Sequence, residues 1–394
     1  MHLTRASVDL LGPDIGREDD ARDWRGRARE FARDVVLPIG AALDAMDPHE
    51  VGAPGSPIRD LLAQAQREGF TRLGAPPHLG GLAASGADEL LVLEELATAD
   101  AALAALLVVA PAPFRWAGAL GAPSLVADVA LPYLAVARTD WIGCCALDGP
   151  SAAVRATPTL AGWRLAGETA AVPGAAVATH ALVACAVDGR SSPGLALVPL
   201  DADGVQRLPV RDAIGLRALC RARIVLDRVH TRIDHVVPVA GGTSAAHAQA
   251  AGAVVALGIG RAAYEGTLRW AREGMWAGRP ACADGAPLPH LHRMYRLLDA
   301  TRTLVRSTYP PQDALRLAAD DDGFARHARA AEAFATEAAF EVAEAAARLC
   351  RADATPQGVP FLDGSAFDPD KLLRDARAAH HDPKETPHGP RQDA

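Results

Sequence analysis

The sequence predicts an α+β protein in which helices and strands occupy separate stretches of the chain. Helical periodicity runs from about residue 20 to 140, short strand-like runs follow to about 238, and helices then return. Because helices and strands do not alternate, segregated domains are expected, not a parallel βα sheet. The expected architecture is an N-terminal all-α domain (1–140), a middle small antiparallel β barrel or sandwich (141–238), a C-terminal four-helix bundle (239–382) and a flexible tail (383–394).

The first helical signal lies in "ARDWRGRAREFARDVVLPIG". Its apolar residues Trp24, Ala28, Phe31 and Val35 recur at spacings of four, three and four, which places them on one face of an amphipathic helix. Proline lacks the N–H that an interior helical position needs, so we expect Pro38 to end this helix.

A second, more apolar helix is predicted from "SGADELLVLEELATADAALAALLVVA". Ser85, followed three residues later by Asp88, is typical of an N-terminal cap. The Leu and Ala positions from Leu90 to Leu107 are apolar nearly all round, which indicates a buried helix.

The middle of the chain has the pattern of a small β domain. The runs "GWRLAG", "HALVACAVDG", "GLALVPLD" and "RARIVLDRV" favour strands and are separated by Gly, Pro, Asp and Ser turn signals.

Composition and charge exclude several classes of protein. A chain with 49% hydrophobic and 22% charged residues and a formal net charge of −8 is typical of globular proteins and argues against a nucleic-acid binder. The N-terminus lacks a signal-peptide pattern, and no uncharged apolar run reaches the roughly 18 residues of a membrane span, so we expect a cytoplasmic protein. The 6 cysteines show neither C-x-x-C spacing nor nearby histidines in ligand register, so no metal site is expected.

One motif imitates a dinucleotide-binding fingerprint. Gly258, Gly260 and Ala263 fit G-x-G-x-x-A, but the second strand ending in an acidic residue, which a Rossmann unit needs, is replaced by helix end and loop. We interpret these small residues as a contact that lets two helices pack closely.

Six stretches, taken in order, resemble the acyl-CoA dehydrogenase family from about residue 20 to 382. They are "REFARDVVLPIG", "REGFTRLGAPPHLGG" with "LVLEELATADAALAAL", the hairpin "GWRLAGETAAVPGAAVATHALVACA", the strand pair "IGLRALCRARIVLDRV", and the helical signatures "ALGIGRAAYEGTLRWARE" and "DKLLRDARAA". The resemblance implies FAD between the β domain and the C-terminal helices, an acyl-CoA or acyl-carrier-protein thioester against the flavin, and a homo- or hetero-oligomer, usually a tetramer. It also implies a carboxylate that removes the α-proton while the β-hydride goes to the flavin.

Neither usual position of that carboxylate holds an acid here. Nine residues after Arg374 of the R-D-A signature stands Pro383, and the second family position, ten residues before Gly258, is Ala248. The candidates for a relocated catalytic group are therefore His247, His380, His381 and Asp382. For each, a solvated or merely hydrogen-bonded side chain is the alternative interpretation.

The flavin contacts implied by the resemblance are eroded as well. The family's T-E-x-x-A-G-S-D loop corresponds to "ALDGPSAAV", and its hairpin aromatic and Thr correspond to Ala171 and Pro173. The candidate ring contacts are Leu147, Asp148, Ser151, Val172, Pro173 and Gly174.

The pyrophosphate contacts are also altered. The family's R-x-x-F-G stretch corresponds to "EGMWAG", with Gly274 and Ala277 at the Arg and Phe positions, and its Q-x-x-G-G turn corresponds to "RLCRA". Arg348 and Arg351 are the candidates to replace the lost charge, or else cations that favour a helix C-terminus.

Three functions remain open at this point. The first is a flavin-dependent oxidoreductase on an acyl thioester, with a relocated base or as a degenerate subunit of a mixed assembly. The second is a flavin monooxygenase that uses one of the histidines. The third is a non-redox, flavin-free acyl-thioester binder or structural partner.

Overall fold

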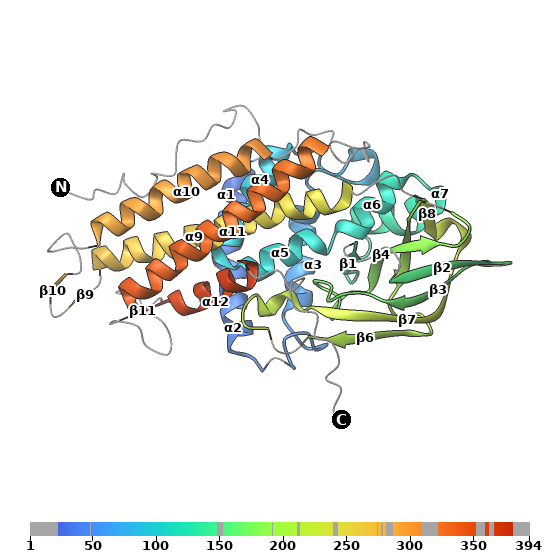
Figure 1. The fold of residues 1–394 in the computed structure, drawn as a ribbon, viewed down its shortest axis with the longest axis horizontal. Coiled ribbons are helices and arrows are strands. Elements are labelled where there is room, and N and C mark those ends of the chain that lie inside the picture. The colour runs from blue at the N-terminus through green and yellow to red at the C-terminus, as the bar shows by residue number, and fades with distance from the viewer. Residues whose placement is uncertain are drawn as a thin grey trace, which may run out of the picture.

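The computed structural model describes residues 23–47, 49–147, 153–190, 192–210, 213–238, 243–273, 275–276, 279–280, 287–308, 322–351, 359–361 and 366–380. A body of helices forms one part of the molecule, and a curved sheet forms the other (Figure 1). The expected α+β architecture is confirmed. The tail after residue 382 lies outside the described residues.

The N-terminal region is mainly helical in its described part. Its elements are α1 (Trp24–Phe31), the π-helical turn η2 (Ala32–Val36), α2 (Leu37–Ala45), α3 (Ile58–Glu68), η3 (Phe70–Arg72), η4 (Pro77–Leu79), α4 (Gly86–Ala99), α5 (Ala101–Val109), α6 (Ala112–Leu120), α7 (Pro123–Leu125), the π-helical η5 (Val126–Ala130) and α8 (Leu131–Leu134).

The prediction that Pro38 ends the first helix is wrong. The chain stays helical from α1 through η2 into α2, where Pro38 occupies one of the first two positions. The wider π-helical turn before it interrupts the regular i to i−4 ladder, so the missing N–H of proline does not break a regular α-helical hydrogen bond there. The predicted stripe is buried at Trp24, Ala28 and Phe31.

The second predicted helix has the expected start but is two helices. Ser85 Oγ accepts from Asp88 N at 3.1 Å, and Asp88 Oδ2 accepts from Ser85 N at 2.9 Å, which completes a capping box. The helix then breaks at Asp100, whose Oδ1 accepts from Leu103 N at 2.9 Å and so caps α5.

The sheet has the strand order β6-β7-β3-β2-β4-β5-β8, with β1 paired to β4. The strands are β1 (Gly143–Ala146), β2 (Val154–Thr159), β3 (Gly162–Glu168), β4 (His180–Val187), β5 (Gly194–Pro199), β6 (Val205–Pro209), β7 (Ala222–Thr231) and β8 (Val236–Pro238), and the short helices η6 (Arg217–Leu219) and η7 (Ile233–His235) flank β7. Most pairs are antiparallel as predicted, but β1 and β2 run parallel to β4. The segment 169–179 turns the chain back after β3, so β4 has the direction of β2.

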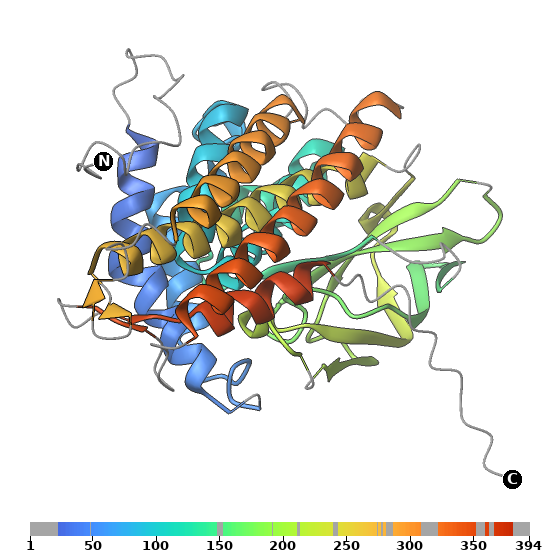
Figure 2. The ribbon, with the colours of Figure 1, turned by 60° about the vertical axis from the view of Figure 1, so that its left-hand side comes forward.

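The C-terminal region contains the four expected long helices. They are α9 (Thr243–Glu273), α10 (Leu288–Thr308), α11 (Asp322–Cys350) and α12 (Pro369–His380), with small ladders of β9 (Met275–Trp276) on β10 (Arg279–Pro280) and β11 (Val359–Pro360) on β12 (Ala366–Phe367). Figure 2 shows α9, α10 and α11 side by side.

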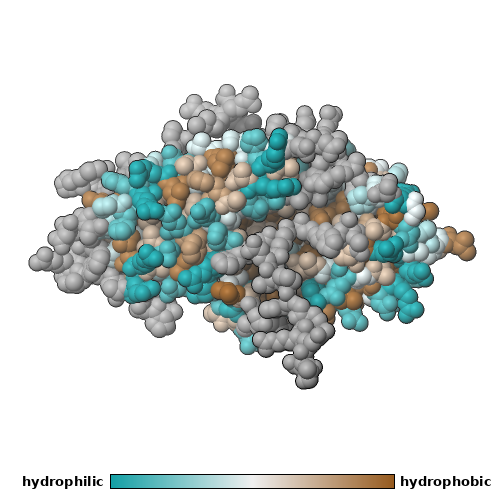
Figure 3. All heavy atoms as spheres, in the orientation of Figure 1, coloured by the Kyte–Doolittle hydropathy of each residue, from teal (hydrophilic) through white to brown (hydrophobic). Residues whose placement is uncertain are grey.

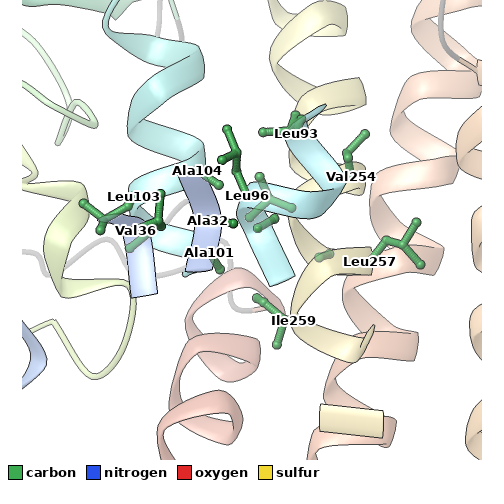
Figure 4. Close-up of a cluster of buried hydrophobic side chains, with 14 of the residues drawn as sticks. Ala32, Val36, Leu93, Leu96, Ala101, Leu103, Ala104, Val254, Leu257 and Ile259 are labelled. Carbon is green, nitrogen blue, oxygen red and sulfur yellow. The ribbon is translucent and has the colours of Figure 1, made fainter. Parts of the chain in front are cut away.

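The helical domains share one core. Leu93 and Leu96 of α4, Leu103 of α5, and Val254 and Leu257 of α9 are all buried in it (Figure 4). The glycine motif lies inside α9: a Cβ added to Gly258 would lie 2.4 Å from Ala97 Cβ of α4. The interpretation of this motif as a close helix contact is confirmed.

One apolar stretch of the N-terminal region is unusually long. Ala101–Leu120 is long and apolar enough to cross a membrane, with a mean hydropathy of 1.6, but half of it is buried inside the protein. It comprises α5 and α6, so its apolar character serves the core. On the face drawn in Figure 3, hydrophilic and hydrophobic residues are interspersed over the helices.

Candidate functional site

The turn between β6 and β7 docks directly onto α12. Asp375 Oδ1 of α12 accepts a hydrogen bond from Leu216 N at 2.7 Å. Gly215 packs so closely that an added Cβ would lie 2.3 Å from Arg374 O. This contact forms the junction between the β domain and the C-terminal helices.

The loop 169–177, called the hairpin loop below, joins β3 to β4 and is attached to the same turn. The hairpin expected from the resemblance is not formed, because β2 lies between these two strands in the sheet. Gly174 N donates to Leu219 O at 2.7 Å, and Ala176 N donates to Cys220 O at 3.0 Å. Val172 N donates to Ala222 O at 2.8 Å, in an isolated bridge to the start of β7. The loop that the resemblance places against a flavin is thereby held close to α12.

These hydrogen bonds decide whether the described loop fits a flavin ring. Pro173 has neither an N–H nor a hydroxyl, and the N–H groups of Val172 and Gly174 already donate within the protein. The Thr169 hydroxyl donates to Ala170 O at 2.8 Å and accepts from Ile224 N at 3.0 Å. These groups therefore do not fit the polar edge of a flavin in the way that the resemblance implies.

The remaining candidate ring contacts give no further support for a flavin site. Leu147 is half-buried and packs with the apolar cluster between the sheet and α6. Asp148 and Ser151 lie outside the described residues.

The candidate pyrophosphate contacts are exposed at the end of α11. Arg348 donates to Glu344 Oε1 at 2.8 Å, one helical turn earlier, so its charge is already partly compensated. Arg351 is exposed, and Gly274, Ala277 and Ala352 lie outside the described residues.

The candidate catalytic histidines do not converge. The half-buried His247 ring packs edge-on against Phe324, with centroids 5.1 Å apart, whereas the exposed His380 ring stacks on Phe340 at 5.7 Å. Phe324 and Phe340 are sixteen residues apart on α11, about 24 Å along its axis. The two histidines therefore cannot act on the same atom. His381 and Asp382 lie outside the described residues.

Position 248 lies on the surface of α9. Ala248 is exposed, so its methyl group supplies no proton acceptor where a family base stands. The other base position, Pro383, lies outside the described residues.

A buried charge cluster lies at the junction, and it was not predicted from the sequence. Lys371 Nζ lies 2.8 Å from Asp375 Oδ2 and 3.1 Å from Asp100 Oδ2, so it links α12 to the start of α5. The i, i+4 spacing of Lys371 and Asp375 was the available signal. Nothing in the sequence pointed to Asp100.

A second buried network joins α4 to the C-terminal helices. Arg261 Nη1 of α9 lies 3.2 Å from Glu94 Oε1 and 3.1 Å from Glu95 Oε1, and Arg302 of α10 also binds Glu94. Burial would raise the pKa of Glu95, but Arg261 and Arg25 outweigh it and lower this pKa to about 2. The network therefore connects the N-terminal helices to the C-terminal ones.

A pocket of about 330 Å³ lies elsewhere in the β domain. Its walls include Thr159, Pro199 and His235. Thr159 ends β2 beside Gly162, the first residue of β3, whereas the hairpin loop follows the other end of that strand. Seven residues of strand separate the two places by about 20 Å, so the pocket is distinct from the junction.

Comparison with known proteins agrees with this architecture. Residues 18–116 match the model of the acyl-CoA dehydrogenase N-terminal domain. The structure resembles glutaryl-CoA dehydrogenase from Mycobacterium smegmatis with a TM-score of 0.77, at 19% identity over 95% of this chain and 93% of that one. A glutaryl-CoA dehydrogenase from the same organism in complex with FADH2 gives 0.76, at 18% identity over 95% of this chain and 92% of that one.

The protein thus has the acyl-CoA dehydrogenase fold, and its resemblance to the acyl-CoA dehydrogenase family is confirmed. A curated relative is the 3-sulfinopropanoyl-CoA desulfinase of Paraburkholderia xenovorans, which is 28% identical in an alignment of 389 residues that covers 91% of each chain.

Proposed function

We propose that the protein is an acyl-thioester-binding subunit of the acyl-CoA dehydrogenase fold that does not itself carry out flavin-dependent dehydrogenation. In this proposal a dehydrogenase-like partner subunit supplies the FAD and the carboxylate base of a mixed cytoplasmic assembly. The observation that carries it is the hairpin loop, where Pro173 replaces a donor and the N–H groups of Val172 and Gly174 are already bonded.

The chemistry of the base positions supports the same proposal. Removal of an α-proton needs an acceptor whose pKa suits the task and which reaches the substrate. Ala248 and Pro383 provide none. His247 and His380 cannot share this role, because their rings contact distant residues of α11. The domain boundaries at 140, 238 and 382 are part of the same proposal.

A dye-linked assay with the isolated chain tests this function. The protein is incubated with excess FAD, butanoyl-CoA and an artificial electron acceptor, and calorimetry follows thioester binding in parallel. We expect binding of butanoyl-CoA without dye reduction. Turnover by the isolated chain would contradict the proposal, and so would a failure to bind acyl thioesters of several chain lengths.

The curated relative favours a second candidate function. That relative is a desulfinase, which acts on a sulfinate-bearing acyl-CoA. In this case the chain cleaves the bond between the sulfinate sulfur and the acyl carbon that carries it, and leaves the thioester intact. Water supplies a hydrogen to that carbon and its oxygen to the sulfur, so a saturated acyl-CoA and sulfite are released. This step needs no carboxylate that removes an α-proton. Release of sulfite from 3-sulfinopropanoyl-CoA by the isolated chain is the expected result, and its absence would exclude this candidate.

A further inference from the structure

The turn between β6 and β7 has an unusual backbone. Leu216, before η6, has a φ of 52°, and Cys220, after it, has a φ of 47°. Left-handed backbone is unfavourable for residues with a Cβ, so surrounding contacts must hold these two positions in place.

Asp375 holds the first of the two positions. Its buried carboxylate accepts from Leu216 N through Oδ1 at 2.7 Å and binds Lys371 Nζ through Oδ2 at 2.8 Å. Lys371 in turn reaches Asp100 Oδ2 at 3.1 Å. Both oxygens of Asp375 are therefore engaged, which fixes the orientation of its side chain.

The charge state of this cluster agrees with its geometry. Burial alone would lower the pKa of Lys371, but the carboxylates of Asp100 and Asp375 outweigh it, so this pKa is raised and the ammonium group is kept. Burial raises the pKa of Asp375, and Lys371 opposes that shift.

The far side of the turn holds the hairpin loop. Leu219 O accepts from Gly174 N at 2.7 Å, and Cys220 O accepts from Ala176 N at 3.0 Å. Asp375 fixes Leu216, and the two carbonyl groups belong to residues three and four positions after it. A displacement of Leu216 therefore moves both acceptors of the loop.

A second anchor fixes the turn from the N-terminal domain. Arg217 donates through Nη1 to Asp44 O and through Nη2 to Met46 O, each at 2.6 Å. Arg374 Nη2 of α12 reaches Asp44 Oδ2 at 2.9 Å. Since the turn is already held against α2, Asp375 is needed for its orientation more than for its attachment.

We propose that Asp375 is a positioning residue, which sets the hairpin loop 169–177 through the hydrogen bond from Leu216 N and the carbonyls of Leu219 and Cys220. The inference rests on the proposed function and deepens it, because the bonded N–H groups of this loop are the observation that carries that function. It concerns the loop's own hydrogen bonds, so it can fail while the proposed function stands, and the reverse.

Hydrogen exchange of the full chain, followed by mass spectrometry, tests this role. In Asp375→Ala the loop amides lose their support, and loss of a hydrogen bond to a charged group corresponds to exchange about tenfold faster or more. Asp375→Asn keeps an acceptor for Leu216 N but lacks the charge, so its loop should exchange within about threefold of the wild type. Arg377→Ala, at an exposed position of the same helix, is the control and should leave the loop unchanged.

Two outcomes would overturn the proposal. One is an Asp375→Ala loop as protected as the wild type. The other is an Asp375→Asn loop that loses protection as fully as the alanine variant, because the charge and not the hydrogen bond would then matter.

The wild type alone gives a second measurement in case Asp375→Ala does not fold. If the relay exists, the amides of Leu216, Gly174 and Ala176 open together, and their protection factors agree within about threefold. Exchange of Gly174 and Ala176 a hundredfold faster than that of Leu216 would show that the loop opens independently of the turn.

Discussion

Arg261 of α9 and Glu95 of α4 form a buried ion pair, with Arg261 Nη1 3.1 Å from Glu95 Oε1. Arg25 Nε of α1 lies 2.7 Å from the same carboxylate oxygen, so one side chain links three helices that are distant in the sequence. Removing one partner of such a network leaves buried charges without compensation. The acid dependence of stability should therefore depend on Glu95.

Glu95→Gln should remove much of that acid dependence. The pKa of Glu95 is about 2 in the folded protein against 4.5 as its ordinary value. A lowered folded-state pKa adds stability above pH 4.5 that is lost as the pH falls towards 2, and the shift corresponds to about 3 kcal/mol. Urea unfolding at pH 7 and pH 3.5 should show a smaller difference for the variant than for the wild type. Equal differences would contradict this assignment.

His180 should make the protein less stable in weak acid. It packs against Phe114 and Trp141, and burial lowers its pKa to about 4. Between pH 6.5 and 4 this side chain binds a proton in the unfolded chain but not in the folded protein. Lowering the pH over this range therefore decreases the free energy of unfolding by up to about 3 kcal/mol. In His180→Phe this part of the pH dependence should vanish. An NMR titration that finds a pKa near 6.5 for His180 would refute the argument.

Gly258→Ala should destabilise the fold, because Gly258 serves a helix contact and not the binding of a dinucleotide. The added methyl group would lie 2.4 Å from Ala97 Cβ, so α4 and α9 must move apart at a cost of about 1–3 kcal/mol. Gly55→Ala, where nothing lies within 4 Å of the added Cβ, is the matched control. Thermal unfolding of both variants checks the difference, and detectable NADH binding by the wild type would revive the dinucleotide interpretation.

Pro173 should limit the affinity of the hairpin loop for flavin. Pro173→Val restores an N–H, and Pro173→Thr restores an N–H and a hydroxyl, each worth about 1 kcal/mol or roughly fivefold in affinity. Quenching of FAD fluorescence should therefore rank the affinities as Thr, then Val, then Pro. No increase in either variant would mean that other groups limit flavin binding.

Local patterns predicted much of the fold. The Ser85 capping box, the buried face of α1 and the close helix contact at Gly258 all follow from spacing that is visible in a few residues. The predictions were wrong where the surrounding structure determines whether a helix continues or ends. A π-helical turn lets the helix pass Pro38, and capping by Asp100 divides an apolar run that looks continuous.

The site was less predictable, because its groups meet only in three dimensions. The erosion at Pro173 is visible in the sequence, but the use of the Val172 and Gly174 N–H groups depends on partners 45 to 50 residues away. The cluster of Asp100, Lys371 and Asp375 joins residues about 270 positions apart. His381, Asp382, Asp148 and Ser151 stay predictions, because they lie outside the described residues.

The flavin content of the isolated chain tests directly whether this protein holds FAD by itself. The protein is incubated with excess FAD, passed through a desalting column and denatured, and the released flavin is measured by its absorbance. If the loop cannot bind the flavin ring, because Pro173 has no N–H and the N–H groups of Val172 and Gly174 are already bonded, almost no flavin remains with the protein. Retention of close to one FAD per chain would show that the isolated chain binds the cofactor despite Pro173, and would contradict the proposed function.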